Sequence, residues 1–378
     1  MTEKYKNALE LHEKHHGKME VKSKVPVSTR GDLALAYTPG VADVCRVIAE
    51  DASLAKKYTL KSNTIAVVSD GSAVLGLGNI GAEGAIPVME GKAILFKEFA
   101  NVDAFPICLR TQDIEEIIAI VKNIAPVFGG INLEDIAAPK CFEIEKRLRA
   151  ELDIPVFHDD QHGTAVVVLA ALINALKVAG KNKETVHIVI NGAGAAGTAV
   201  TELLLKYGFE NITVCDSQGA IYKDRKNITE EKLDLAQKTN KDQKSGTLAD
   251  VIVGRDIFIG VSKGNTLTKD MVKSMNKDPI VFALANPTPE IMPQDAKEAG
   301  AFIVATGRSD FPNQINNVFV FPGIFRGALD NNTVQITDEM LVKAAENLAN
   351  HVQNIHQENI LPDLFDKTVA EVVAKAIQ

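Results

Sequence analysis

The most constraining feature of the sequence is a glycine-rich loop that lies between an apolar strand pattern and an apolar helix pattern. The strand pattern is VHIVIN (186–191), and the helix pattern follows the loop at 197–207. In a G-x-G-x-x-G loop the first glycine allows a tight turn, the second lets the backbone approach a pyrophosphate, and the third allows close packing of helix on strand. The helix N-terminus then faces the phosphate charge. The loop predicts a dinucleotide site that comprises Gly192, Ala193, Gly194, Ala195, Ala196 and Gly197.

An acidic residue ends the next strand pattern. Asp216 follows 211–215 and lies roughly twenty positions after the first glycine of the loop, the spacing at which such folds contact the adenosine ribose. A carboxylate there accepts hydrogen bonds from the ribose hydroxyls and repels a 2′-phosphate, so it favours NAD over NADP. Lys223, Arg225 and Lys226 are close in sequence and would soften that preference, which leaves NADP possible.

Apolar strand patterns alternate with helical patterns along most of the chain. They lie at 64–69, 103–109 and 154–157 in the first half, and at 186–191, 211–215, 257–260, 280–285 and 302–306 in the second half. Such alternation is typical of parallel sheets with helices on both faces. We predict an α/β protein with an N-terminal α/β domain (1–160), a Rossmann-like, doubly wound parallel-sheet domain for NAD(P) (161–330) and closing C-terminal helices (331–378).

Helices can be placed from apolar periodicity and from the residues that interrupt it. We expect helices at 3–17, 87–99, 163–178, 338–354 and 366–378. Pro26, Pro39 and Gly40 divide the segment after residue 17 into an extended lead and a helix that begins near Val41.

Composition excludes several classes of protein. The chain has 378 residues, more than one typical core, and 46% of them are apolar. A net charge of −8 gives no general attraction to nucleic acid or to anionic membranes. The charged N-terminus is not a secretory signal, and no apolar run reaches the length of a membrane span. Four scattered cysteines without a CxxC pair fit a reducing compartment, so we expect the cytoplasm.

Acidic residues follow three of the predicted strands. They are Asp70, the pair Glu134 and Asp135, and the pair Asp159 and Asp160. Adjacent carboxylates are costly to bury unless a cation or hydrogen bonds compensate them. Each pair also has a plainer interpretation, as charges at a helix start or as a helix cap. Their joint occurrence with Lys92 and a dinucleotide loop favours a site for Mg²⁺ or Mn²⁺ with positions open to substrate oxygens.

The segment FHDDQHGTA (157–165) also permits a zinc interpretation. His158 and His162 are four residues apart, which is a zinc-ligand spacing on a helix. We interpret both histidines as structural and assign the metal to the carboxylates.

Seven segments together resemble the malic enzymes, in particular the compact bacterial type. They keep the family's order along nearly the whole chain: AYTPGVA (36–42), VVSDGSAVLGLGNIGAEGAIPVMEGKAILF (67–96), INLEDI (131–136), FHDDQHGTA, NGAGAAG (191–197), ALANPTPE (283–290) and NQINNVFVFPG (313–323). The resemblance implies oxidation of (S)-malate by NAD(P)⁺ and decarboxylation of bound oxaloacetate to pyruvate and CO₂. It also implies dependence on Mn²⁺ or Mg²⁺, decarboxylation of added oxaloacetate, and a homodimer or higher homo-oligomer.

The resemblance also assigns roles to single residues. It implies that the N-terminal domain holds substrate and metal, with Lys92 as general base, Asp159 as its helper and Tyr37 as general acid. A lysine acts as a base only if its pKa is lowered. The remaining assignments are the metal ligands Glu134, Asp135 and Asp160, and the residues that hold malate or the nicotinamide ribose, Asn286 with Asn316 or Asn317. Tyr37 and Lys92 can come from different chains of a dimer.

One position departs from the family pattern. The large animal-type enzymes have a carboxylate-binding arginine just after the DG of the glycine-rich segment, whereas this chain reads Asp70-Gly71-Ser72-Ala73. Ser72, a backbone N–H of the glycine-rich segment, and Arg308 remain candidates for binding the distal malate carboxylate. Two other functions also remain open: malolactic chemistry, which releases lactate, and an NAD-binding scaffold without turnover.

Overall fold

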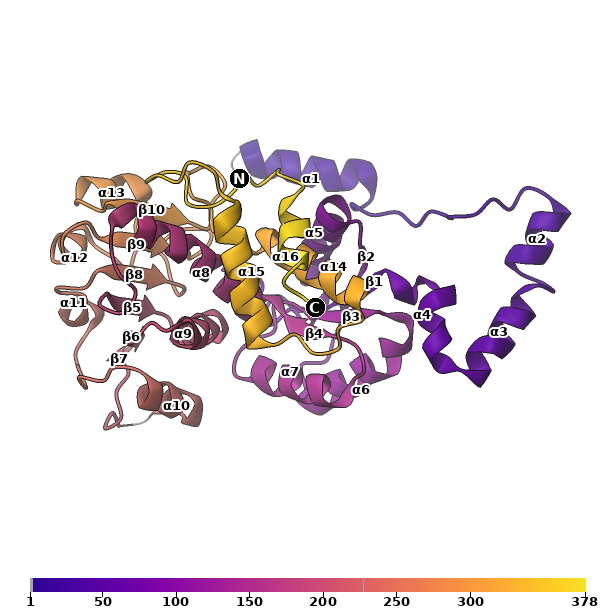
Figure 1. The fold of residues 1–378 in the computed structure, drawn as a ribbon, viewed down its shortest axis with the longest axis horizontal. Coiled ribbons are helices and arrows are strands. Elements are labelled where there is room, and N and C mark those ends of the chain that lie inside the picture. Colours follow the sequence, from indigo (N-terminus) through magenta and orange to yellow (C-terminus); the bar gives the residue numbers. More distant parts are fainter. Residues whose placement is uncertain (1–2, 227) are drawn as a thin grey trace.

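Two sheets lie side by side in the protein (Figure 1). The structure is a computed structural model, and it describes residues 3–226 and 228–378. The first sheet has four strands in the order β2-β1-β3-β4, all parallel. Its strands are β1 (Thr64–Ser69), β2 (Asp103–Cys108), β3 (Gly130–Leu133) and β4 (Val156–His158). Because the strands are parallel, Asp70, Glu134 and Asp159, which follow β1, β3 and β4, come to the same edge of the sheet.

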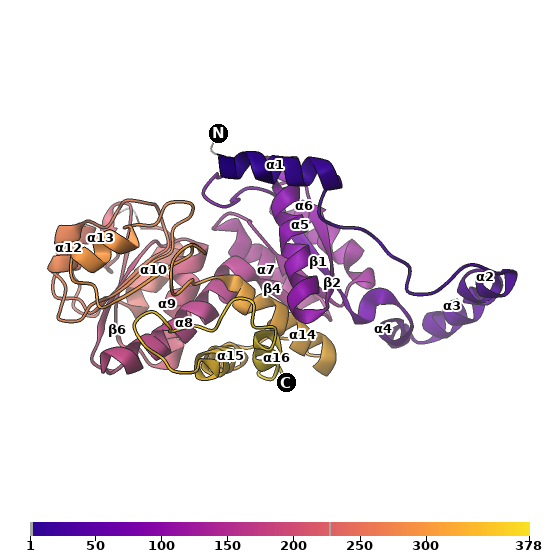
Figure 2. The same ribbon diagram turned by 90° about the horizontal axis from the view of Figure 1, so that it is seen from above.

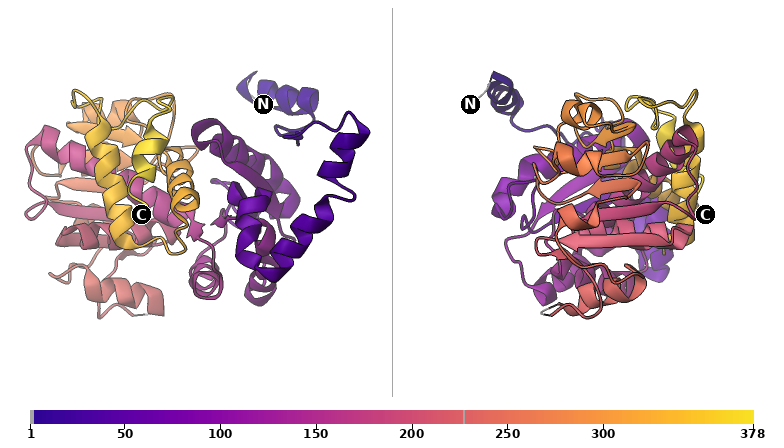
Figure 3. Two further views of the ribbon diagram at one scale, coloured as in Figure 1. Left: turned by 45° about the vertical axis from the view of Figure 1, so that its right-hand side comes forward. Right: turned by 90° about the vertical axis from the view of Figure 1, so that its left-hand side faces the viewer.

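The second sheet has six strands in the order β10-β9-β8-β5-β6-β7. They are β5 (His187–Asn191), β6 (Asn211–Asp216), β7 (Gly219–Ala220), β8 (Ile257–Gly260), β9 (Ile280–Ala283) and β10 (Ile303–Thr306). The right-hand view of Figure 3 faces this sheet. All neighbours are parallel except β6 and β7. The strand order reverses beside β5, which is the switch point of a doubly wound sheet and confirms the predicted fold class.

Helices cover both sheets. The α-helices before β5 are α1 (Glu3–His15), α2 (Arg30–Ala36), α3 (Val41–Glu50), α4 (Ala55–Tyr58), α5 (Gly81–Ala100), α6 (Ile114–Ile124), α7 (Lys140–Glu151) and α8 (Asp159–Ala179). Those after it are α9 (Ala195–Tyr207), α10 (Glu230–Lys238), α11 (Leu248–Val251), α12 (Lys269–Lys273), α13 (Pro293–Glu298), α14 (Phe321–Asn331), α15 (Asp338–His351) and α16 (Val369–Ala374). Short 3₁₀ helices are η1 (Ala52–Leu54), η2 (Leu60–Ser62), η3 (Ala125–Val127) and η4 (Asn317–Phe319).

Several sequence-based helix boundaries were wrong, and the last helix spans Val369–Ala374 rather than 366–378. Helix α5 begins at Gly81 rather than at Pro87, since burial of Ala82 and Ala85 compensates for a proline inside the helix. Helix α8 begins at Asp159 rather than at Gly163, so both aspartates lie in its first turn. Helix α2 occupies part of the expected extended lead, and it begins with a capping box between Thr29 and Asp32, which apolar periodicity does not reveal.

Helix α8 is the core helix that joins the two halves. By length and composition alone α8 could cross a membrane, because an 18-residue stretch of it has a mean hydropathy of 1.7. The expectation that no apolar run reaches the length of a membrane span was therefore wrong. However, 72% of this stretch is buried within the protein, because α9 and α15 pack along the helix. This burial is what a core helix requires.

The C-terminal helices pack against both halves. Phe321 and Phe325 of α14 meet Phe96 of α5 edge to face at centroid distances of 4.7 and 5.4 Å. Helix α15 packs on α8, and α16 packs on α14. The C-terminal segment, which we expected to close the fold, therefore shares one hydrophobic cluster with helices that pack on both sheets. This shared cluster holds the two sheets together.

The N-terminal region leaves the body of the protein. Helix α1 lies beside α5, and the chain then runs out to α2 and α3 at the far end of an arm (Figures 1 and 2). None of the residues of α2 and α3 is buried. The arm, residues 19–50, exposes the large apolar side chains Met19, Val21, Val25, Val27, Leu33, Leu35, Tyr37, Val44 and Val47.

Candidate active site

A cleft of about 650 Å³ lies between the two sheets. Its walls come from the glycine-rich segment after β1, helix α5, the ends of β3 and β8, the start of α8 and the loops around Asn286 and Asn316. Predicted site residues that line it are Lys92, Glu134, Asp135, Asp160, Ala196, Asn286, Asn316 and Asn317. Residues far apart in sequence therefore converge on one cavity.

Glu134, Asp135 and Asp160 form a carboxylate triad. One oxygen from each lies within 4.8 Å of the others, and Glu134 and Asp135 are buried. Burial and the neighbouring Asp160 raise the pKa of Asp135 to about 7. Burial also raises the pKa of Glu134 well above its usual range, although Lys92 acts against this. Among the described residues Asp135 Oδ2 has no hydrogen-bond partner. A divalent cation would relieve this repulsion and accept these oxygens as ligands.

Lys92 lies directly beside the triad. Its Nζ is 2.8 Å from Glu134 Oε1 and 2.5 Å from Asp159 Oδ2, and it is 4.1 Å from the centre of the Phe321 ring. Burial lowers the pKa of Lys92, but the charges of Asp159 and Glu134 outweigh burial and raise the pKa above its ordinary value. In this arrangement Lys92 is protonated.

Asp159 is held from two sides. Besides Lys92, the Asn317 side chain donates to Asp159 Oδ2 at 3.0 Å, and Thr164 in turn donates to Asn317 Oδ1 at 3.1 Å. Gly163 lies one helical turn after Asp159, and a Cβ there would come within 1.8 Å of Asp159 Oδ1. The glycine in FHDDQHGTA therefore makes room for the carboxylate that anchors Lys92.

The two histidines of this segment contact carboxylates. His162 Nε2 lies 2.9 Å from Glu145 Oε1, and the fully buried His158 has its Nε2 3.1 Å from Asp160 Oδ2. Glu145 also accepts from the His158 backbone at 3.2 Å. The contacts support a structural role for both histidines, and the metal-binding group in the described part of the chain contains only the triad.

The glycine loop has the geometry that a pyrophosphate requires. Gly192 has φ +132° and donates from its backbone to Cys215 O at 2.8 Å, which places the end of β6 beside the loop. A Cβ on Gly197 would come within 1.8 Å of Gly192 O, whereas one on Gly194 would meet nothing within 4 Å. The close packing is thus at Gly197, and the open space is at the N-terminus of α9.

Asp216 stands at the end of β6 with all its acceptor sites used. Oδ1 accepts from Gln218 N and Arg225 Nη2, both at 2.9 Å, and Oδ2 accepts from Arg225 Nη2 at 2.8 Å and Lys232 Nζ at 2.6 Å. A carboxylate offers about four such sites. Burial raises the pKa of Asp216, but the bonds to Arg225 and Lys232 outweigh it and hold the pKa at about 2. A ribose hydroxyl would therefore have to displace one of these donors.

Asn286 and Gly76 bring the two sides of the cleft together. Asn286 is exposed on the loop after β9, and a Cβ on Gly76 would come within 2.3 Å of Asn286 O. Only a residue without a side chain at position 76 lets the glycine-rich segment approach the loop that carries Asn286.

Of the two adjacent asparagines, Asn317 contacts Asp159, whereas the Asn316 side chain caps η4 by accepting a 3.0 Å bond from Val318 N.

Several predicted or suggested residues do not line the cleft, among them Asp159, Asp216 and most of the glycine loop. Tyr37, Ser72 and Arg308 are also absent from its lining. Tyr37 is 67% exposed at the end of α2, on the arm. Ser72 Oγ donates to Asp70 Oδ1 at 2.5 Å and accepts from Ala137 N at 2.9 Å, so it braces the glycine-rich segment. Arg308 donates through Nε and Nη2 to Asp310 at 2.8 and 2.6 Å. Their predicted roles stay predictions.

Sequence reasoning missed one charged residue of the cleft. Lys18 lines the cleft from the turn after α1. It sits in a stretch crowded with lysine and histidine, so no local pattern distinguishes it from a solvated surface lysine.

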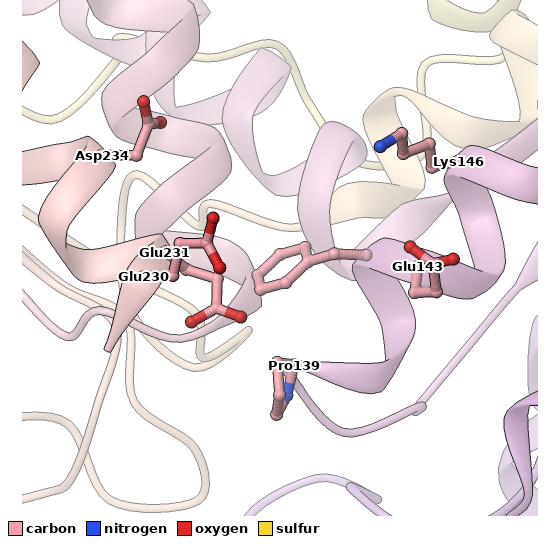
Figure 4. A pocket seen from close by; sticks show the side chains of 7 residues that line it. Pro139, Glu143, Lys146, Glu230, Glu231 and Asp234 are labelled. Atoms are coloured by element: carbon pink, nitrogen blue, oxygen red, sulfur yellow. The ribbon is translucent and has the colours of Figure 1, made fainter.

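A second, smaller cleft of about 390 Å³ opens between α7 and α10 (Figure 4). Its acidic side chains outnumber its single lysine, Lys146; they are Glu143, Glu230, Glu231 and Asp234. This negative charge disfavours anionic ligands such as dinucleotides and carboxylic acids. The larger cleft is therefore the candidate active site.

Comparisons with known proteins agree with this geometry. The family "Malic enzyme, N-terminal domain" matches residues 16–149, and the family "Malic enzyme, NAD binding domain" matches residues 161–378. A bifunctional malic/malolactic enzyme of Bacillus subtilis is 58% identical over 98% of this chain and 91% of its own length. An NAD-dependent malic enzyme of Geobacillus stearothermophilus is also 58% identical, over 96% of this chain and 76% of its own.

More distant relatives include longer proteins and solved structures. The chain is 48% identical to an NADP-dependent malic enzyme of Escherichia coli, of which it covers 51%. A crystal structure of an NAD-dependent malic enzyme from Thermotoga maritima superposes with a TM-score of 0.95 at 52% identity, over 98% of each chain.

Proposed function

This chain belongs to the malic enzyme family, and from that premise we propose that it oxidises (S)-malate with NAD(P)⁺ and releases pyruvate and CO₂, with Mn²⁺ or Mg²⁺ as required cofactor. Decarboxylation of added oxaloacetate is part of the same proposal. The observation that carries it is the position of Lys92, which lies between Asp159 and Glu134 beside the carboxylate triad.

The triad fits a hard divalent cation. Its oxygens lie close together, Asp135 Oδ2 has no partner among the described residues, and the raised pKa values of Glu134 and Asp135 reflect burial and uncompensated negative charge. A bound Mn²⁺ or Mg²⁺ would polarise the C2 oxygen of the substrate. Glu134, Asp135 and Asp160 would hold it.

Lys92 is the proposed base for the C2 hydroxyl. It can take that proton only in its neutral form, so any change that withdraws the charge of Glu134 from its ammonium group favours catalysis. Asp159 keeps Nζ in place, and Asn317 keeps Asp159 in place. The Lys92 side chain is only 10% exposed, so little bulk water reaches its ammonium group.

Two simple experiments test the reaction and its product. Steady-state kinetics with malate and Mn²⁺ should produce free NADH or NADPH together with pyruvate. The Bacillus subtilis relative makes malolactic chemistry the second candidate, which would release lactate with no free reduced cofactor. The third candidate is a scaffold that binds NAD without turnover. In that case wild type and Lys92→Ala would give equal rates of malate oxidation. Malate oxidation at the wild-type rate by Lys92→Ala would refute the role of Lys92.

The cofactor site uses the glycine loop and the start of α9. We expect NAD to bind with its pyrophosphate at Gly192, Gly194 and Ala196, and its adenosine ribose near Asp216. Arg225 and Lys232 bring two positive charges to one negative charge at Asp216. NADP is therefore expected as an alternative cofactor.

The arm supports a homodimer in which Tyr37 acts on a second copy. It exposes a long row of apolar side chains, and the glycine-rich segment that follows β1 also exposes Leu75, Leu77 and Ile80. Contiguous exposed apolar side chains mark association surfaces. An arm docked on a second copy would bury both rows and bring Tyr37 to the other chain's cleft, where it would protonate the enolate of pyruvate.

Mixed dimers test this arrangement. Tyr37→Phe and Lys92→Ala should each be inactive alone, and unfolding and refolding them together should restore about one quarter of wild-type activity, the share of sites with both intact groups in a twofold dimer. If Tyr37 acts within its own chain, no mixed dimer has an intact site, and the mixture stays inactive. Sedimentation velocity of each variant checks that the dimer forms.

We infer a cytoplasmic enzyme that needs neither nucleic acid nor a membrane.

A further inference from the structure

The cleft needs a second positive group for its substrate. Malate carries two carboxylates, and a cation held by the carboxylate triad would account for one of them together with the hydroxyl. Of the candidates from the sequence, the Ser72 hydroxyl is engaged with Asp70 and Ala137, and Arg308 is engaged with Asp310. The third candidate, a backbone N–H of the glycine-rich segment, carries no charge, and neither do the Asn286 and Asn316 amides that line the cleft. A cationic partner for the remaining carboxylate is therefore sought among the other residues of the cleft.

Lys18 is placed to be that donor. In the part of the chain that the structure describes, the lysines that line the cleft are Lys18 and Lys92, and Lys92 already contacts Glu134 and Asp159. The Lys18 ammonium group donates to Pro87 O at 2.6 Å. Since an ammonium group has three donors, it can bind an anion without losing this bond.

The turn that carries Lys18 is anchored on helix α5. Lys18 N donates to Glu90 Oε2 at 3.2 Å. Gly17 has φ +101°, and a Cβ there would come within 2.8 Å of Glu90 Oε1. The backbone before Lys18 therefore needs glycine both for its conformation and for its approach to Glu90.

The next residue of α5 lies against the side chain. Lys18 Nζ lies 3.7 Å from the position of a Cβ on Gly91, which is an ordinary contact distance. In the order Glu90, Gly91, Lys92, the first residue anchors the turn, the second lies against the ammonium group, and the third is the proposed base. This arrangement makes the Lys18 turn a built part of the cleft.

Partial burial also prepares Lys18 for an anion. Burial lowers the pKa of Lys18, and Glu90 acts in the opposite direction. An ammonium group that has lost part of its hydration gains more from an anionic partner than a fully hydrated one does.

We propose that Lys18 binds the malate carboxylate that the triad and its cation leave free, and that it thereby selects dicarboxylic 2-hydroxy acids. The proposal rests on the proposed function, because it assumes that malate occupies this cleft. Lys18 is then a substrate-binding residue, distinct from the base and from the metal ligands.

Kinetics of a charge-removing variant test the proposal. Lys18→Met keeps the apolar stem and removes the charge, and loss of a charge-assisted hydrogen bond should raise the KM for malate by roughly 10- to 100-fold. The KM for NAD⁺ should stay unchanged, and Lys18→Arg should recover part of the loss. The matched control is Lys14→Met, on the exposed last turn of α1, which should behave like wild type.

Binding of two hydroxy acids separates charge recognition from a change of cleft shape. Tartronate has two carboxylates and lactate has one. In the presence of Mn²⁺, Lys18→Met should weaken inhibition by tartronate by the same factor as malate binding, and leave inhibition by lactate unchanged. Equal weakening of both would overturn the proposal, as would an unchanged KM for malate. If wild type does not turn malate over, the proposed function fails, but ligand-induced thermal shifts with tartronate and lactate still decide the role of Lys18.

Discussion

The carboxylate triad and Asp216 are two acidic sites at strand ends, and they solve the same electrostatic problem differently. Asp216 is nearly buried, yet Arg225 and Lys232 contact it and its pKa is held at about 2. In the triad, the pKa of Asp135 is raised to about 7, and Lys92 is the only lysine in contact with any of its members among the described residues.

The difference indicates which cation each site uses. At Asp216 the chain supplies more positive than negative charge, so the site is complete without a metal. At the triad the chain supplies less positive than negative charge. Buried negative charge without compensation is costly. The triad should therefore depend on a cation from solution, whereas Asp216 should not.

The largest expected effect is loss of a triad carboxylate. Asp160→Asn keeps the shape of the side chain but removes a charge from the metal site, and we expect kcat with Mn²⁺ to fall by about a thousandfold, a few kcal/mol of transition-state stabilisation. Initial-rate kinetics with malate and NAD⁺ measure this. Asp216→Asn is the matched control and should retain kcat within a few-fold. Equal losses in both variants would remove the distinction between the two sites.

The next effect concerns stability rather than rate. At a Mn²⁺ concentration about 100 times its Kd, binding should stabilise the folded state by roughly 2.7 kcal/mol, which raises Tm by several degrees. Asp135→Asn should lose most of that shift, while Asp216→Asn should keep it. Scanning calorimetry with and without chelator measures it, and a Mn²⁺ shift that survives Asp135→Asn would contradict the assignment.

A smaller effect is expected in the choice of cofactor. Arg225→Ala removes the main cation at Asp216 and exposes its negative charge, so the preference for NADP over NAD should fall by about tenfold, the value of one charge-assisted contact. Calorimetry with 2′,5′-ADP and 5′-AMP, which differ only in the 2′-phosphate, measures this without turnover. Lys241→Ala, on an exposed ion pair with Glu210, is the control. Unchanged discrimination would mean that the 2′-phosphate is recognised elsewhere.

The smallest effect is expected for Lys232→Met. Lys232 is 30% exposed and contacts only one oxygen of Asp216, so its ion pair is worth about 0–1 kcal/mol. The NADP-to-NAD ratio should change by roughly five-fold or less. The same binding assay should rank Arg225→Ala above Lys232→Met, and the reverse order would show that Lys232 is the dominant cation.

Local sequence predicted the parts of the site that lie at strand ends. Strand periodicity and the glycine loop place Gly192 and Asp216 in a doubly wound sheet, and parallel strands bring Glu134 and Asp160 to one edge. These inferences succeed because strand direction and side-chain alternation depend on residues that are near in sequence. The extent of α5 and α8 was not predictable in this way, since burial against other helices decided where they begin.

What the sequence by itself determined is the fold class, the family and the members of the triad, because short motifs with a fixed order carry them. Tertiary structure alone decided which charges meet. It placed Lys18 against Glu90 and Gly91 in the cleft, filled the acceptor sites of Asp216 with Arg225 and Lys232, and left Tyr37 exposed on an arm. Such contacts depend on distances of a few ångströms between segments far apart in the chain, and no local pattern encodes them.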